Sequence, residues 1–259
     1  MTFNKTFIFM EVHHSHHIGQ KKKWNEYIIE FIMLFVAVSL GFLAENLREQ
    51  QIEKHREISY LKNVHEDLQL DFQTIDTVVI SNNVRLAALD SLFEGLRSKK
   101  ITNEEVYYYI RNLALRSTFE SSQIGFDQIK SAGGLRMVKN KVIYTGIQEY
   151  EKMLSSVEEL EVLRDRTLEQ GRFKMAKLFN AQILYEMSIR QVEGILRFPR
   201  PAHADNILSN NYTELNELIN LVATGLNTNR YINSRLILLN KIGKSLDDAI
   251  IKEYGESMH

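Results

Sequence analysis

Four histidines crowd the N-terminal tail of the chain: His13, His14, His16 and His17, within the run EVHHSHH. Neutral imidazole is a good ligand for zinc, copper or nickel, and His-rich tracts of this kind can hold such ions. These histidines are therefore the candidate metal ligands. The run lacks the Cys partners of a closed tetrahedral site, so the alternative is an unstructured tail that gains positive charge below about pH 6.5.

Catalytic signatures are missing from the rest of the chain. The absence of Cys excludes thiolate metal sites, Cys nucleophiles and disulfides. The run Gly243–Ser245 resembles the end of a phosphate-binding loop, but Leu238 stands where that motif requires Gly. Distant side chains can still converge into a site that spacing does not reveal. We expect no enzyme activity and no cofactor.

One stretch near the N-terminus is apolar enough to cross a membrane. Range 27–44 carries only one charge, Glu30, and a span normally needs ~20 predominantly apolar residues. The lysines at 21–23 and the interfacial aromatic Trp24 stand just before it, as in a membrane anchor. We predict a transmembrane helix over 24–46. A buried core helix and a cleaved signal peptide are the alternatives.

The distribution of basic residues predicts the orientation of this helix. Three lysines lie immediately before it, whereas Arg48 is the one basic residue close behind it. Basic residues favour the cytoplasmic side. The predicted organisation is therefore a cytoplasmic His/Lys-rich tail (1–23), the transmembrane helix (24–46) and an extracytoplasmic α-helical domain (47–259).

One face of the predicted transmembrane helix is small and polar. Successive residues of an α-helix are 100° apart around its axis, so the other residues of this face lie within about 60° of Glu30. A Gly and an Ala four residues apart allow close helix approach, and Arg48 can neutralise Glu45. The face is a candidate helix–helix contact, although Gly and Ala are also simply common in membrane spans. Its members are Glu30, Ala37, Gly41, Ala44, Glu45 and Arg48.

The overall composition predicts an all-α fold. Gly and Pro together make about 5% of the chain, against a typical ~12%, whereas sandwiches and barrels need many turns. The net charge is −1, from 32 basic and 33 acidic residues. A nucleic-acid-binding protein would show a clear basic excess, so we expect no nucleic-acid partner.

A long helix is predicted to continue from the membrane segment and to end at Gly95 and the basic run Arg97–Lys100. Apolar residues recur at intervals of three and four, a pattern typical of a helix that buries one stripe. Two polar residues interrupt the stripe: His65, interpreted as a core histidine, and Asn82, interpreted as a register-setting residue. The stripe consists of Leu61, His65, Leu68, Phe72, Ile75, Val79, Asn82, Leu86, Leu89, Phe93 and Leu96.

Further helices follow, separated by capping residues. Thr102 begins a capping box, a glycine pair at 133–134 stops a helix, and Asn140 is a good N-cap. The stretch 158–166 is interpreted as a solvated, charged surface. The predicted helices cover 102–117, 121–131, 140–195, 211–224 and 228–254. With no strand expected, the prediction is one transmembrane helix continuing into a long helix and an antiparallel helical bundle.

Several segments are similar to one known family. They are the run at 11–17, the span with its flanks at 21–49, HEDLQLD at 65–71, FDQIKSAGGLRMVKNKVIYTGIQEY at 126–150, and the C-terminal 230–254. The chain resembles a family of uncharacterised bacterial single-span membrane proteins with a His-rich N-terminus and an extracytoplasmic helical domain. Gly134 departs from the Asn that relatives more often carry. The resemblance implies a membrane-anchored helical protein with its N-terminus inside, and no activity.

Together these observations predict a non-enzymatic protein of the bacterial inner membrane, with its N-terminus in the cytoplasm and its C-terminal domain in the periplasm. Its partners are membrane lipid and either a protein partner or further copies of the chain. The first hypothesis is a partner-binding, scaffold or sensing module. The alternative is an oligomeric membrane subunit or small channel formed through the face of Glu30, Ala37 and Gly41.

Overall fold

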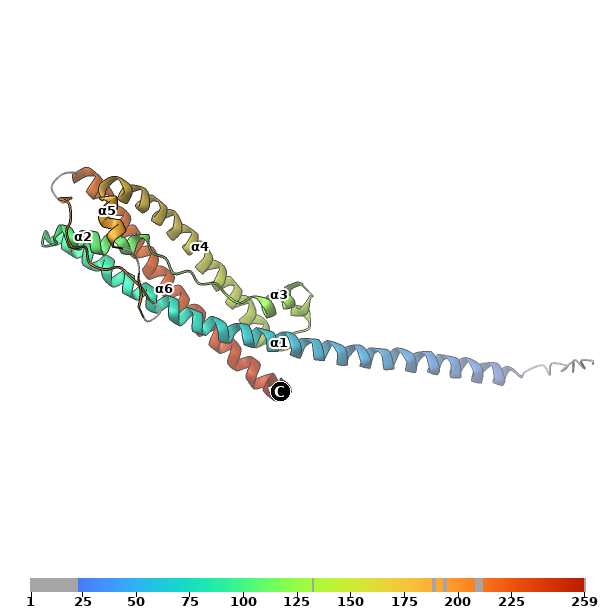
Figure 1. Ribbon diagram of the computed structural model, residues 1–259. Coiled ribbons are helices and arrows are strands. Elements are labelled where there is room, and N and C mark those ends of the chain that lie inside the picture. The colour runs from blue at the N-terminus through green and yellow to red at the C-terminus, as the bar shows by residue number, and fades with distance from the viewer. Residues whose placement is uncertain (1–22, 132, 188–189, 193–194, 208–211, 259) are drawn as a thin grey trace, which may run out of the picture. The chain divides into compact units, whose positions relative to one another are not determined.

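The computed structural model describes residues 23–131, 133–187, 190–192, 195–207 and 212–258. The chain divides into two units, Met1–Ile52 and Glu53–His259. The described residues are overwhelmingly α-helical, which confirms the all-α prediction. The helices are α1 (Trp24–Ser98), α2 (Asn103–Ile110), α3 (Ile124–Ser131), α4 (Lys141–Leu178), α5 (Ala181–Glu186) and α6 (Tyr212–Tyr254) (Figure 1).

Several short elements connect the helices. Three are 3-10 helices, at Arg111–Ala114, Gly134–Arg136 and Gly255–Ser257. Two are strands, β1 (Arg190–Val192) and β2 (Ile195–Arg197), which pair antiparallel with Val192 opposite Ile195.

Three long helices enclose the core of the second unit. The part of α1 beyond residue 53 packs with α4 and α6, and α4 and α6 lie side by side (Figure 1). Hydrogen bonds join Asn82 to Asn233 and Gln69 to Asp247, so α6 runs antiparallel to α1. The segment 99–140 returns the chain before α4 begins, and α4 therefore runs parallel to α1.

The core consists of two apolar clusters along these helices. The first gathers range 61–78 of α1, 143–157 of α4 and 232–250 of α6, with Phe126 of α3. The second gathers Leu89 and Leu92 of α1 with residues from α2, α4, α5 and the first half of α6. Buried polar residues lie between the two clusters along all three long helices.

The predicted apolar stripe of α1 is confirmed. Its members from Leu61 to Leu96 are all buried or half-buried. Asn82 is buried and its amide donates to Asn233 Oδ1 at 2.9 Å, which fixes α1 against α6. His65 is half-buried, and its Nδ1 lies 2.5 Å from Asp247 Oδ1. The histidine is thus satisfied by a partner, as a core residue should be.

Predicted start and stop signals are also present. Thr102 and Glu105 form a reciprocal capping box at the start of α2. Asn140 caps α4 by accepting from the backbone of Val142 and Ile143. Gly133 adopts the left-handed conformation, with φ 65°.

The first helix ends at Ser98, within the predicted basic run, and Lys99 takes the left-handed conformation (φ 55°). Two other predicted helix ends are wrong. The helix begun at Thr102 ends at Ile110, and a 3-10 turn replaces its predicted last part. The helix predicted to reach 195 ends at Leu178, because Asn180 caps the separate helix α5 by accepting from Gln182.

Two further expectations fail for reasons of packing and turn chemistry. The predicted break at Gly225 is absent, and α6 is continuous through it. A Cβ at Gly225 or at Gly171 of α4 would crowd the side chain of Leu113, so both glycines make room for a packed neighbour. The hairpin was unexpected, although Gly194 stands between its strands in the sequence, and Gly at such a position is a hairpin signal.

Candidate functional site

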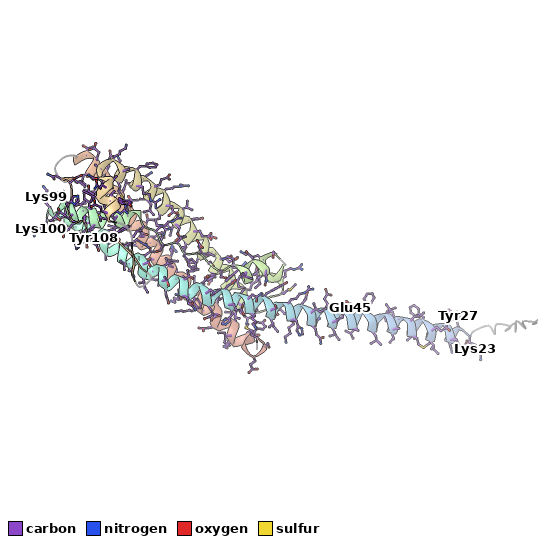
Figure 2. All side chains as sticks on the ribbon, in the orientation of Figure 1. Lys23, Tyr27, Glu45, Lys99, Lys100 and Tyr108 are labelled. Atoms are coloured by element: carbon purple, nitrogen blue, oxygen red, sulfur yellow. The ribbon has the colours of Figure 1, made fainter. Side chains whose placement is uncertain are left out.

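The N-terminal part of α1 exposes its apolar side chains. Phe31 and Phe42 are 68% and 74% exposed, and the other large apolar residues from Tyr27 to Leu47 are exposed as well. Figure 2 shows side chains along this part of α1, with Tyr27 and Glu45 labelled. Among the described residues, α1 is the one helix long and apolar enough to cross a membrane, and none of its apolar window is buried.

The candidate helix–helix face lies on this part of α1. Ala37, Gly41 and Ala44 are exposed, and a Cβ added at Gly41 would have no neighbour within 4 Å. The expected ion pair is present, with Arg48 Nη2 2.6 Å from Glu45 Oε1. Glu30 is half-exposed. The contact between helices remains a prediction.

The candidate metal ligands cannot be placed. His13, His14, His16 and His17 lie outside the described residues. Within the residues that the structure does describe, no group of three or more His, Asp or Glu is arranged to hold a metal ion.

Two aspartates of α1 bind the loop before α3, and we call this arrangement the acidic clasp. Asp67 Oδ1 accepts from Ser122 Oγ at 2.6 Å, and its Oδ2 accepts from Gly125 N at 2.7 Å. Asp71 Oδ1 accepts from Ser122 N at 2.7 Å. Asp71 Oδ2 accepts from Ser121 Oγ at 2.5 Å and from Tyr150 Oη at 2.6 Å. The clasp therefore joins α1, the loop and α4.

The clasp also supplies the N-terminal cap of α3 from another helix. The amide of Gly125 in the first turn of α3 donates to Asp67, and a carboxylate there also interacts favourably with the helix dipole. The backbones of α1 and α3 approach each other closely at Gly125. A Cβ at Gly125 would lie 2.3 Å from Val64 N and 2.5 Å from Asn63 C, a separation that real structures do not tolerate.

The pKa shifts and hydrogen bonds of the acidic clasp are typical of a structural role. Burial raises the pKa of Asp71, against the lowering effect of its hydrogen bonds from Ser121, Tyr150 and Ser122. Burial and the charge of Asp71 raise the pKa of Tyr150. Each carboxylate oxygen of Asp67 and Asp71 accepts from the chain itself. The pair therefore joins α1 to the loop before α3 and to α4.

A second polar group, which we call the cationic layer, separates the two apolar clusters. It comprises Asn82 and Arg85 of α1, Glu161 and Arg164 of α4, and Asn233 of α6. Arg164 is 1% exposed, and its Nη1 donates to Ser117 O at 2.8 Å and to Glu161 Oε1 at 3.3 Å.

Within this layer the carboxylate of Glu161 accepts hydrogen bonds from two partners. Its Oε1 also accepts from Phe119 N at 3.1 Å, so Arg164 and Glu161 together hold the segment after α2. Burial raises the pKa of Glu161, although the charge of Arg164 opposes that rise. The interpretation of 158–166 as a solvated surface is wrong at these two positions, because the segment after α2 covers them.

Sequence reasoning missed the clasp and the charged residues of the cationic layer, although it singled out Asn82. Asp67 and Asp71 lie in range 65–71, which carries the family resemblance and predicts no role for either residue. Arg85 follows the seam residue Asn82 by three positions, which places it on the buried face of α1. A charged residue at a core position of a heptad-like stripe was the signal that could have found it.

The chain was compared with protein-family models, with curated proteins and with solved structures, and none of the three comparisons found a match. The fold of the described residues defines the class: a helical protein with, in that part of the chain, one candidate membrane-spanning helix.

Proposed function

We propose that the protein is anchored in a bacterial inner membrane by residues 24–46, with a helical domain in the periplasm that binds a protein partner or senses a ligand. It has no catalytic role of its own. The partner, scaffold or sensing function resides in residues 47–259. This proposal agrees with the family resemblance, which remains a prediction.

The observation that carries the anchor is the exposed apolar surface of α1. Large side chains such as Phe31, Leu34 and Phe42 face away from the helix axis without cover from the described residues. Soluble monomers rarely expose contiguous apolar patches larger than a few hundred Å². A lipid bilayer removes this surface from water, and a helix satisfies its own backbone hydrogen bonds there.

The flanking residues support the orientation. Lys23 and Tyr27 stand at the start of α1 (Figure 2). Aromatic residues at the end of a membrane span favour the membrane–water interface, and the lysines at 21–23 favour the cytoplasmic side. The opposite orientation would place three lysines on the translocated side.

Labelling of single cysteines tests the topology. The natural chain has no Cys, so Ser15→Cys and the exposed Ser155→Cys each create the one thiol in the protein. In intact spheroplasts a membrane-impermeant maleimide should label Ser155→Cys alone, and both variants after permeabilisation. Labelling of Ser15→Cys alone would reverse the orientation, and labelling of both before permeabilisation would contradict the anchor.

Exposed apolar residues beside a surface hollow support a partner-binding role for the domain. Ile80 of α1 and Ile237 of α6 are both more than half exposed, and they border a hollow of about 490 Å³ together with Lys241 and Lys244. Ile237→Glu should abolish co-purification of a partner from native membranes. Val162→Glu, at an equally exposed position of α4, is the matched control. Equal recovery with both variants would remove this surface from the proposal.

The alternative function is an oligomeric membrane subunit or small channel. The open space beside Gly41 favours it, because a second helix can approach there closely. Gly41→Cys should then form a disulfide dimer in native membranes, and Phe35→Cys on the opposite side should not. Equal yields would exclude a specific contact. A pore would show ion flux in vesicles that Glu30→Gln abolishes.

A further inference from the structure

We propose that a hollow between α1, α2 and the segment 198–200 binds a small organic anion with a planar body, such as an aromatic carboxylate. We call this hollow, of about 410 Å³, the aromatic pocket. Its volume lies within the range of about 300–1,000 Å³ that is typical of small-molecule sites. The inference rests on the ligand-sensing part of the proposed function and names the class of ligand.

The two walls of the aromatic pocket differ in the size of their side chains. On one side α1 presents small side chains, among them Ala87 and Ala88. On the other side lie the rings of Tyr108, Tyr109 and Phe198, and Tyr108 is labelled in Figure 2. Small residues opposite aromatic rings leave room for a planar ligand, whose faces can then stack on those rings.

The aromatic wall is held in place by contacts within α2 and the turn that follows it. The rings of Tyr108 and Tyr109 meet edge to face, with their centroids 5.2 Å apart. The side-chain amide of Asn112 donates to the backbone carbonyl oxygens of both tyrosines at 3.3 Å. The wall is therefore preorganised, which lowers the entropic cost of binding a ligand.

Two guanidinium groups stack on rings of this wall. Arg200 lines the pocket, and its Cζ lies 4.7 Å from the centroid of the Tyr108 ring. Arg111 does not line the pocket, but its Cζ lies 4.6 Å from the centroid of the Phe198 ring. A stacked guanidinium keeps its N–H donors in its own plane, where they can reach an anion beside the ring. Arg200 is therefore the residue that we expect to pair with the negative charge of the ligand.

Neither guanidinium has a carboxylate partner among the described residues, whereas Arg97 pairs with Glu94 and Arg116 pairs with Asp165. Nε of Arg111 is a buried donor without a hydrogen-bond partner in that part of the chain. Burial lowers the pKa of Arg111, and no neighbouring carboxylate opposes this shift. The described residues that line the pocket include no Asp or Glu. The charge of the pocket thus favours an anion, and guanidinium donors fit the two oxygens of a carboxylate.

Fluorine NMR of the full chain in a fluorine-free detergent tests the proposal. The probes are para-fluorobenzoate, its neutral analogue para-fluorobenzamide, and trifluoroacetate, which is an anion without a ring. Line broadening beyond that of a detergent blank, titrated to saturation, gives the Kd of each probe. We expect para-fluorobenzoate to bind roughly tenfold more tightly than the other two, because it alone combines a ring with a negative charge. No saturable broadening by para-fluorobenzoate, or equally tight binding of either other probe, would overturn the proposal.

The variant Arg200→Gln tests the charge of the pocket. Arg200 is exposed, so this substitution should leave the fold intact. It should weaken the binding of para-fluorobenzoate roughly tenfold and leave that of para-fluorobenzamide unchanged. The control Arg97→Gln removes a 70% exposed arginine outside the pocket lining and should keep the wild-type Kd. Equal weakening in both variants would overturn the proposal, because the overall charge of the chain would then attract the probe.

The variant Ala87→Leu tests the space of the pocket. Ala87 is exposed and lines the pocket, so the larger side chain should fill part of the hollow and weaken the binding of both ring-bearing probes. The control Ala176→Leu changes an exposed alanine of α4 that does not line the pocket, and it should bind like the wild type. Unchanged binding by Ala87→Leu would overturn the proposal. These measurements follow binding by the purified chain, so they can fail while the membrane anchor and the partner-binding surface at Ile237 stand.

Discussion

The two halves of α1 use the same residue types in opposite ways. In the first half Phe31, Leu34 and Phe42 are exposed, whereas in the second half Leu61 and Leu68 are fully buried. The first half carries no charged residue from 31 to 44, and the second confines its apolar residues to one stripe. A helix that is apolar all round requires an apolar medium, while a striped helix needs only other helices.

The two halves of α1 are stabilised by different surroundings. The second half packs into the core with α4 and α6, and its buried charges are held by the acidic clasp and the cationic layer. The first half lacks such partners among the described residues. We infer that lipid takes the place of a core there.

The largest expected effect comes from charging the first half. Leu34→Arg combined with Val38→Arg places two cations near the centre of the predicted span, each costing ~2.5–3.5 kcal/mol on insertion scales. The double variant should move from the membrane to the soluble fraction, or be degraded. The control Glu49→Arg lies beyond the span and should stay in the membrane pellet. Sedimentation after alkaline extraction measures the distribution, and two identical pellets would contradict the account.

The packing of the second half should be strongly destabilised by a substitution at one close backbone contact. Gly125→Ala forces a Cβ against the main chain of Asn63 and Val64, where no flexible side chain can yield. We expect a loss of roughly 4 kcal/mol in the free energy of unfolding, among the larger single-residue effects.

The control for this variant is Gly133→Ala. Gly133 has open space but a left-handed backbone, so this change should cost only about 1 kcal/mol. Urea unfolding of the full chain in detergent compares the two. Similar losses would mean that α3 can move away from α1.

Removing a carboxylate of the clasp should have a smaller effect. Asp67→Ala leaves the amide of Gly125 and the hydroxyl of Ser122 without their acceptor. We expect a loss of roughly 1–3 kcal/mol by urea unfolding, because buried donors then lack partners. Asp127→Ala, an exposed aspartate of α3, is the control. A loss no greater than the control's would show that the clasp contributes nothing.

The smallest effect is a pH dependence. Because burial raises the pKa of Asp71, the folded protein binds that proton more tightly than the unfolded chain does. The resulting stabilisation is full below the unfolded pKa of about 3.9 and disappears as pH rises through the folded value. Asp71→Asn should therefore destabilise the protein more at acidic than at neutral pH.

Urea unfolding across that pH range measures this difference. Asp127→Asn corrects for the general loss of one negative charge. A destabilisation by Asp71→Asn that grows toward neutral pH would have the wrong sign.

Local patterns predicted most of the helices. The stripe through Leu61 and Leu89, the capping box at Thr102 and the cap at Asn140 depend on neighbours within one or two helical turns, so the sequence displays them directly.

Tertiary contacts determined what the sequence did not reveal. Gly225 resembles a helix stop, but it makes room for Leu113 from a distant segment. In the sequence Arg164 resembles a solvated residue, but in the structure its guanidinium donates to the carbonyl oxygen of Ser117. The partners of Asp67 lie more than fifty residues away, so no local spacing could have identified the clasp.

The single tryptophan of the chain offers the most direct test of the membrane anchor. Trp24 begins α1, and we expect it to lie at the membrane–water interface. The full chain is reconstituted in vesicles whose lipids carry bromine either near the headgroup or near the end of the acyl chain. Bromine near the headgroup should quench Trp24 fluorescence more strongly than bromine at the chain end. Fluorescence that neither lipid quenches would contradict the anchor at residues 24–46.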